Sequence, residues 1–174
     1  MSSFFDRFLS LTRAIFEMRE GRIYGKVDMQ KTYYFTKEFD AFVPFNFRWG
    51  KLGPFSYELS NTFDIITRQG YISYDGSYHY DESNFRYIED VELPSIIPQF
   101  FYELDDECEE EGYNRIHFIE CLASIHFLYK YSGMENRDDT FSRLRTLKQN
   151  RMEFLEHLMI PSWQFLLKYN LVTR

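Results

Sequence analysis

The sequence predicts a helix-rich α+β fold, and three observations lead to it. Apolar residues recur at spacings of three and four over most of the 174 positions, as in helices that bury one face. Asp75-Gly76 separates two short aromatic stretches, which is the strongest local signal of an antiparallel hairpin. A loop, a helix and this hairpin follow one another between residues 49 and 80. We therefore expect winged-helix-like helices with a small antiparallel hairpin, followed by a C-terminal helical bundle.

The first half of the chain is assigned element by element. A helix is expected over residues 4–20 and another from Asp28, as its N-cap, to about residue 39. Residues 41–49 look extended, and Pro44 favours an edge position. Pro54 is expected at the first position of the next helix, which Gly70 ends. The strands 71–74 and 77–80 then form a hairpin with a two-residue turn.

The second half is expected to be helical. The predicted helices are 99–111, which ends acidic, and 116–131, which is the most apolar; residues 138–157 form one helix or two, and Pro161 begins the last helix. Neither a repeat nor a linker separates these segments. We expect a single domain, 1–174, with a winged-helix-like part at 1–95 and a helical part at 96–174.

Composition and charge restrict the function. The net charge of −7 disfavours nucleic acids, whose phosphates attract Lys and Arg. Cys108 and Cys121 are too few for a disulfide framework and are interpreted as free thiols in a reducing compartment. Because neither a signal peptide nor a membrane-spanning run is evident, we expect a cytoplasmic protein without a membrane partner.

Known catalytic and nucleotide-binding motifs are not found in the sequence. His117 and Cys121 have the i, i+4 spacing of a ligand pair, but no second pair with ligand spacing follows. We therefore predict no catalytic residue, no metal site and no cofactor, and hence a protein that is not an enzyme. The remaining enzymatic hypothesis is a hydrolase whose site is assembled from His117, Glu120 and His126.

The charge pattern bears on DNA binding. The predicted helix 54–69 has a net charge of −1, and residues 71–92 carry six acidic side chains against Arg86 alone. A duplex would repel such a face. A basic cluster lies further along the chain, and we expect it to pair with the acidic helix 99–111, with phosphate contact as the alternative; it consists of Arg143, Arg145, Lys148 and Arg151.

Aromatic residues suggest a different partner. With a two-residue turn, Ile72 faces His79 and Tyr71 faces Tyr80, so one side of the hairpin packs and the other is exposed. Exposed Tyr and Trp are typical anchors of protein interfaces. The alternative is that the hairpin tyrosines cover the protein's own core. The predicted partner-binding residues are Trp49, Tyr57, Tyr71, Tyr78 and Tyr80.

Several segments resemble one family. Gln30-Lys31-Thr32-Tyr33-Tyr34-Phe35 looks like its "QKLLYL" helix, and the stretch 49–59 resembles its "YGPYS-x-EL" signature through Gly53-Pro54-Phe55-Ser56 and Glu58-Leu59. Gln69-Gly70-Tyr71-Ile72 is similar to "LGLI", and residues 121–131 (CLASIHFLYKY) look YwgA-like. The family is the Panacea or SocA-like antitoxin group of phage-associated proteins, with the related YwgA-like proteins. Thr32 and the inserted Lys51-Leu52 depart from the pattern.

The resemblance implies an antitoxin-like protein-binding module, which neutralises a toxin by direct binding or delivers it to a protease. We expect no catalysis in this role. The alternative is a transcriptional regulator, or another DNA-associated protein with a winged-helix-like core, that contacts phosphates through the basic cluster.

Overall fold

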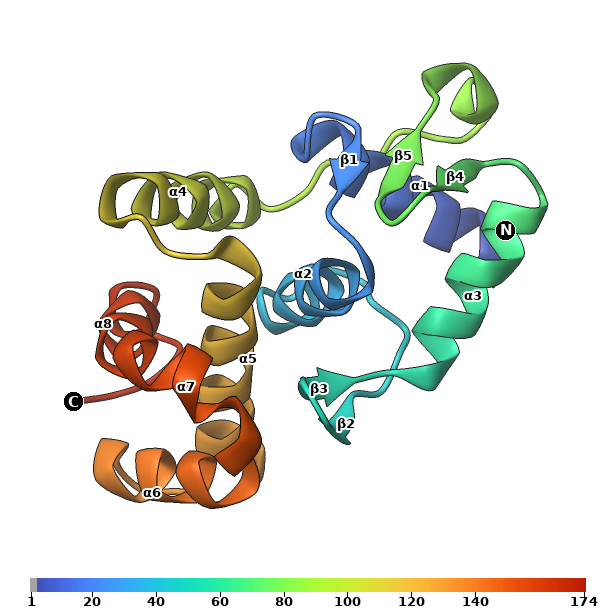
Figure 1. Cartoon of the computed structure of the whole chain (residues 1–174). Helices are drawn as coiled ribbons and strands as arrows, with labels where there is room; N and C mark the ends of the chain where they lie inside the picture. Colours follow the sequence, from blue (N-terminus) through green and yellow to red (C-terminus); the bar gives the residue numbers. More distant parts are fainter. Residues whose placement is uncertain (1–2) are drawn as a thin grey trace. The chain divides into compact units, whose positions relative to one another are not determined.

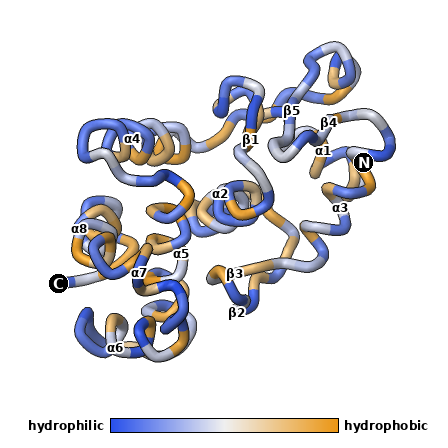
Figure 2. The backbone as a smooth tube through the Cα atoms, viewed as in Figure 1, coloured by the Kyte–Doolittle hydropathy of each residue, from blue (hydrophilic) through white to orange (hydrophobic). Residues whose placement is uncertain are grey.

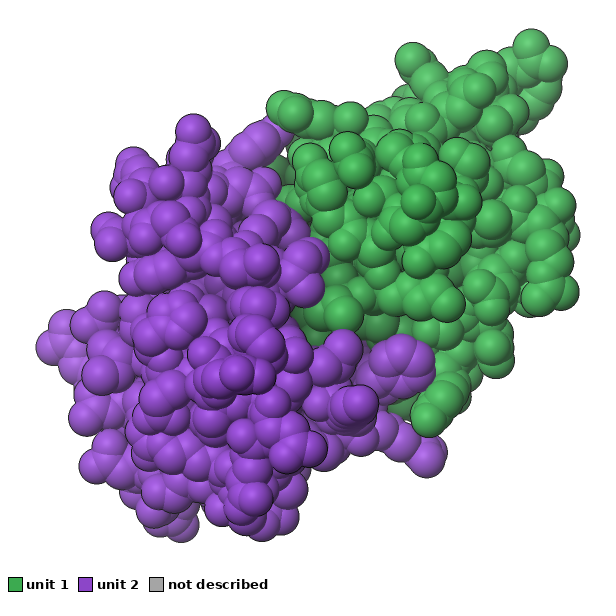
Figure 3. Space-filling view, in the orientation of Figure 1, with its two compact units in different colours: residues 1–46, 56–99 green, residues 47–55, 100–174 purple. Residues whose placement is uncertain are grey.

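The computed structural model describes residues 3–174, and the chain forms two compact units (Figure 3). The first unit comprises residues 1–46 and 56–99, and the second comprises residues 47–55 and 100–174. The boundary near residue 99 lies four positions beyond the division between the predicted parts. The short segment 47–55 belongs to the second unit although both of its neighbours belong to the first.

The first unit has the element order of a winged helix (Figure 1). Its helices are α1 (Phe4–Met18), α2 (Lys26–Glu38) and α3 (Tyr57–Arg68), followed by the short 3-10 helix η1 (Glu82–Phe85). Its strands β1 (Arg22–Ile23), β4 (Ile72–Tyr74) and β5 (Tyr78–Tyr80) form an antiparallel sheet in the order β1-β5-β4. The helix-rich α+β class with a small antiparallel hairpin is thus confirmed.

The start of α2 differs from the prediction. Gly25, with a φ of 93°, is the N-cap, and Asp28 lies inside the first turn. The Asp28 carboxylate accepts hydrogen bonds from the Tyr24 amide at 2.8 Å and the Thr32 hydroxyl at 3.2 Å. An acidic residue at this position reaches back to the amide before the helix, so Asp28 stabilises the helix start without being its cap.

Aromatic rings fill the core of the first unit. Phe63 of α3 lies 5.4 Å from Tyr33 of α2 and 4.9 Å from Tyr78 of β5, between ring centroids. Phe8 of α1 lies 5.9 Å from Tyr33. The buried Tyr33 hydroxyl shares a 2.7 Å hydrogen bond with Thr12, and burial raises the pKa of this phenol strongly. The rings therefore join α1, α2, α3 and the sheet through edge-to-face and tilted contacts.

The second unit is built around one apolar helix, α5 (Arg115–Tyr131). It packs against α8 (Met159–Lys168), α6 (Arg137–Leu147) and a hairpin formed by β2 (Arg48–Gly50) and β3 (Gly53–Phe55). Helix α4 (Ile96–Glu111) precedes it and spans the unit boundary. Short turns η2 (Gln149–Arg151), α7 (Met152–Leu155) and η3 (Glu156–Leu158) link α6 to α8. Figure 2 shows hydrophilic residues over much of α4 and α6.

Three prolines are placed differently from the prediction. Pro54 lies in β3, opposite Trp49, and the following helix begins at Tyr57 with Ser56 as its N-cap. Pro98 and Pro161 lie inside the first turns of α4 and α8, which begin earlier than expected. A proline without an N–H is tolerated throughout a first turn, so it does not mark the first helical residue uniquely. Among residues 3–174, no helix combines the length and the apolar character needed to cross a bilayer.

Candidate functional site

Helix α3 is held in place by a glutamine of α2. The Gln30 side-chain amide donates to the Ser56 carbonyl and to the Ser60 hydroxyl, both at 2.9 Å. Its carbonyl oxygen accepts from the Ser56 amide, also at 2.9 Å. The Ser56 hydroxyl in turn accepts from the Leu59 amide at 3.2 Å and caps the helix. Because Gln30 and Ser56 are buried, this network fixes the start of α3 firmly.

The two faces of α3 differ in solvent exposure. Leu59, Phe63 and Ile66 are fully buried on one face. On the other, Tyr57 is 74% exposed and Ile65 is 45% exposed. Polar and charged residues surround these two, and we call the whole exposed set the α3 face; it comprises Tyr57, Glu58, Asn61, Asp64, Ile65 and Arg68.

The register of the β4–β5 hairpin differs by one residue from the prediction. Tyr74 pairs with Tyr78, and Ile72 pairs with Tyr80, which leaves the three-residue loop 75–77 instead of a two-residue turn. The Asp75 carboxylate explains the longer loop, because it accepts from the Ser77 amide at 3.2 Å and hydrogen-bonds the His79 ring at 2.8 Å. Gly76 supplies the positive φ, 104°, at the tip.

The shifted register changes which tyrosines are exposed. Tyr78 is buried against Phe63, so its predicted exposure is wrong. Burial also raises the pKa of Tyr78 to about 12. Tyr71 and Tyr80 are half-buried, and both rings contact Phe85, at 5.5 and 5.0 Å. The exposed tyrosine of the hairpin is instead Tyr74, whose ring lies 4.7 Å from that of Tyr78 and so borders α3.

The hairpin is less acidic than the sequence suggested. Most of the acidic residues between 71 and 92 lie beyond β5, in η1 and in the segment that follows it. In the hairpin itself only Asp75 is acidic, and it contacts His79. Basic side chains flank the tip: Arg22 donates to the Ser77 hydroxyl at 3.2 Å, and the Lys26 ammonium lies 5.9 Å from the Tyr74 ring centroid. Repulsion from DNA is thus weaker here than expected.

Trp49 belongs to the second unit, whereas the tyrosines with which it was grouped belong to the first. Its half-buried ring contacts Phe127 of α5 at 5.9 Å, and the Lys148 ammonium lies 5.7 Å from its centroid. Gly53 of the same hairpin lies against Ser124 of α5. A Cβ at Gly53 would lie 2.5 Å from the Ser124 hydroxyl, and its φ is 92°. Only glycine fits there without displacement.

A buried ion cluster lies beside this hairpin. The Glu120 carboxylate binds the Lys148 ammonium at 2.7 Å and the Arg151 guanidinium in a bidentate manner, at 2.7 and 3.2 Å. Burial favours a neutral Glu120, but the hydrogen bonds from Arg151 and Lys148 outweigh it and lower the pKa of the carboxyl group. Burial lowers the pKa of Lys148, and although Glu120 opposes this, repulsion from the neighbouring Arg151 guanidinium adds to it.

These contacts answer two predictions about the second unit. The basic cluster pairs mainly with α5 and η3, since Lys148 and Arg151 bind Glu120 and Arg145 binds Glu156 at 2.7 Å. The predicted pairing with the acidic helix is wrong for these three residues. Both carboxylate oxygens of Glu120 are engaged, whereas a general base of a hydrolase needs one available for a reacting proton.

Both cysteines of the second unit are buried, whereas its histidines differ in exposure. Cys121 is fully buried, Cys108 is nearly so, and burial raises the pKa of each thiol to about 12. Both therefore remain protonated at neutral pH and are poor nucleophiles. The His117 ring lies 4.9 Å from that of Phe154, and His126 is buried. Among the described residues, no three His, Cys, Asp or Glu side chains are grouped as metal ligands.

Comparison with known proteins adds no assignment, since no family model and no curated protein matches this sequence.

Proposed function

We propose that this chain is an antitoxin-like protein-binding module that neutralises a partner toxin by direct binding, without catalysis. The α3 face with Tyr74 is the binding surface in this proposal. The observation that carries it is the exposure of Tyr57 and Ile65 on a helix whose opposite face is fully buried. Large side chains held outward by a rigid element bind with little loss of conformational entropy, as interface anchors do.

Two further features support the proposal. The segments 30–35 and 49–59 resemble those of the Panacea or SocA-like antitoxins; the first lies within α2, and the second covers most of the β2–β3 hairpin and the first turn of α3. The α3 face also carries Glu58 and Asp64 against Arg68 at the helix end. A mixed, slightly acidic rim around an apolar centre suits a protein partner with a basic or neutral surface.

The test is neutralisation of toxicity in living cells. Each reading frame that borders this gene is expressed as a candidate toxin, alone or with this chain, and colony growth is counted. Wild type is expected to restore growth, and Tyr57→Ala/Ile65→Asp is expected to lose this protection at an unchanged protein level. Tyr87→Ala is the control, because Tyr87 is 85% exposed but lies outside the α3 face. Full protection by the double variant would exclude the α3 face.

The second candidate function is DNA binding, which the winged-helix order favours. Arg22 and Lys26 beside the hairpin tip are the side chains that would contact phosphates. A gel shift with duplex DNA at low salt tests this function. Binding that is abolished in Arg22→Glu/Lys26→Glu would support it, and a chain that shifts no duplex would refute it. A variant that reverses the charge of Arg151 is a poor test of DNA binding, because it also breaks the ion pair with Glu120.

A further inference from the structure

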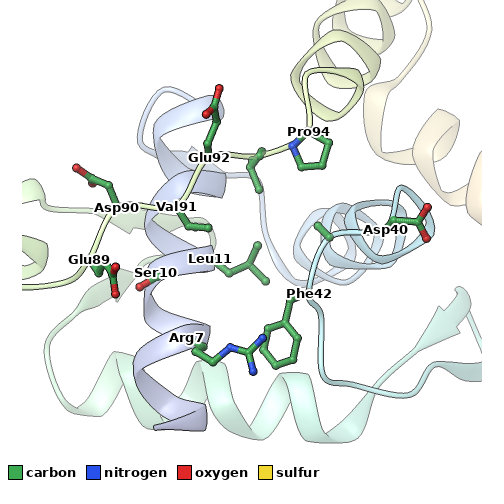
Figure 4. A pocket seen from close by; sticks show the side chains of 12 residues that line it. Arg7, Ser10, Leu11, Asp40, Phe42, Glu89, Asp90, Val91, Glu92 and Pro94 are labelled. Atoms are coloured by element: carbon green, nitrogen blue, oxygen red, sulfur yellow. The ribbon is translucent and has the colours of Figure 1, made fainter. Parts of the chain in front are cut away.

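A groove in the first unit is lined by none of the residues of the α3 face. It has a volume of about 440 Å³, with residues of α1 as its floor (Figure 4). The loop 40–42 forms one wall and the segment 89–94 forms the other. Figure 4 shows Leu11, Phe42 and Val91 directed into the space between the walls. The centre of the groove is therefore apolar, with Phe42 41% exposed and Val91 46% exposed.

The rim of the groove is acidic. Asp40, Glu89, Asp90 and Glu92 line it, against the single guanidinium of Arg7, which lies 3.7 Å from the Phe42 ring centroid. The Asp90 carboxylate forms an ion pair at 2.8 Å with the guanidinium of Arg13, which does not line the groove. Within residues 3–174, the carboxylates of Asp40, Glu89 and Glu92 form no ion pair. Three uncompensated carboxylates around an apolar centre favour a ligand that is basic and partly apolar.

The backbone of the wall 89–93 is available for pairing. The Ile88 carbonyl accepts from Arg13 at 2.8 Å, and the Pro94 carbonyl accepts from the Ile97 amide at 2.9 Å, so both ends of the segment are anchored. Between them, residues 89–93 make no backbone hydrogen bond to any other described residue. An anchored segment with unpaired N–H and C=O groups is a template for a strand from another chain.

From these three observations we propose that the groove binds an extended basic peptide segment of a partner protein. The segment pairs with residues 89–93 as an added strand. One aliphatic side chain enters the space between Leu11, Phe42 and Val91, and Lys or Arg side chains reach Asp40, Glu89 and Glu92. This site is independent of the α3 face, so each proposal is tested without the other.

The probe is a fluorescently labelled peptide of alternating Lys and Val, seven residues long, titrated with the full chain and followed by anisotropy. We expect the Lys-Val peptide to bind saturably, and its binding to weaken as salt is added. The matched Glu-Val and Lys-Ser peptides are expected to bind at least about tenfold more weakly. A Lys-Val peptide with alternate N-methylated amides is also expected to bind weakly, because it cannot complete the added strand. Equal binding of the Lys-Val, Glu-Val and N-methylated peptides would overturn the proposal.

Matched variants separate the groove from general attraction to an acidic protein. Glu89→Gln/Glu92→Gln is expected to weaken Lys-Val binding about three- to tenfold. Glu109→Gln/Glu110→Gln removes the same charge from exposed positions of α4 outside the groove and is expected to leave binding unchanged. Hydrogen exchange of residues 89–93 is expected to slow when peptide is added. Equal weakening by both double variants, or unchanged exchange at 89–93, would overturn the proposal. Ile65→Asp is expected to have no effect on peptide binding.

Discussion

The two hairpins of this protein pack in different ways. In the β4–β5 hairpin of the first unit, the buried Tyr78 ring packs against Phe63. In the β2–β3 hairpin of the second unit, the half-buried Trp49 ring contacts Phe127, and Gly53 lies against Ser124, where a side chain would collide, beside the ion cluster of Glu120. The first hairpin is thus held by a ring that fills the core, and the second needs a position without a side chain and the fixed geometry of charged hydrogen bonds. Aromatic residues in the two hairpins therefore have different roles, although the sequence suggested one common surface.

Loss of Glu120 is expected to have the largest effect. Glu120→Gln leaves the Lys148 and Arg151 charges without their carboxylate, which costs about 3–5 kcal/mol for a buried pair. Both tryptophans, Trp49 and Trp163, lie in the second unit, so urea unfolding followed by their fluorescence reports on that unit. Glu156→Gln is the control, because its exposed pair with Arg145 contributes about 1 kcal/mol or less. Similar losses for both variants would contradict a dominant buried cluster.

Tyr78 and Tyr57 are expected to separate core from surface in the first unit. Tyr78→Ala removes a buried ring and is expected to cost about 3 kcal/mol. Tyr57→Ala changes a mostly exposed ring, and its effect is expected to stay within about 0.5 kcal/mol. Denaturation followed by far-ultraviolet circular dichroism, with hydrogen exchange of α3, measures both effects. If Tyr57→Ala were as destabilising as Tyr78→Ala, Tyr57 would belong to the core and not to the α3 face.

The two hairpin glycines distinguish crowding from backbone strain. Gly76→Ala is expected to lower the free energy of unfolding by about 1 kcal/mol, because alanine disfavours a positive φ. Nothing lies within 4 Å of the added Cβ, so crowding does not contribute. Gly53→Ala adds a collision with Ser124 and is expected to cost about 2–4 kcal/mol in total. Thermal unfolding compares them. The double variant Gly53→Ala/Ser124→Ala removes the colliding hydroxyl and keeps a good helix former in α5, so its loss of stability beyond that of Gly76→Ala is expected to shrink. An unchanged loss would rule out the Ser124 hydroxyl as its source.

The stability of the second unit is expected to depend on pH through the titration of Glu120. This is the smallest of the predicted effects. The folded pKa of this carboxyl group lies below its ordinary value of 4.5. Its contribution to stability is therefore present above about pH 4.5 and is lost as the pH falls through the folded pKa. Urea unfolding of wild type between about pH 6 and pH 3 is expected to show a steeper loss than Glu120→Gln. If the free energy of unfolding fell equally with pH in both proteins, the protonation of Glu120 would not be coupled to unfolding.

The sequence predicted those features that local chemistry controls. The spacing of Leu59, Phe63 and Ile66 identified the buried face of α3, and Asp75-Gly76 located the hairpin. Together with the order of the helices, these patterns predicted the helix-rich α+β class and the winged-helix order. Such features were predictable because helix periodicity and turn conformations depend on residues within a few positions of one another.

Only the tertiary structure decided which side chains from distant parts of the chain come into contact. The burial of Tyr78 depended on Phe63 of another element, and β5 also pairs with the distant β1, Tyr78 opposite Ile23. Glu120 lies 28 positions before Lys148 and 31 before Arg151, so no spacing rule could bring it to them. The groove likewise joins α1 to residues 40–42 and 89–94. Side chains distant in the chain come together only in the folded structure, and the groove is made in this way, whereas the α3 face lies on one helix.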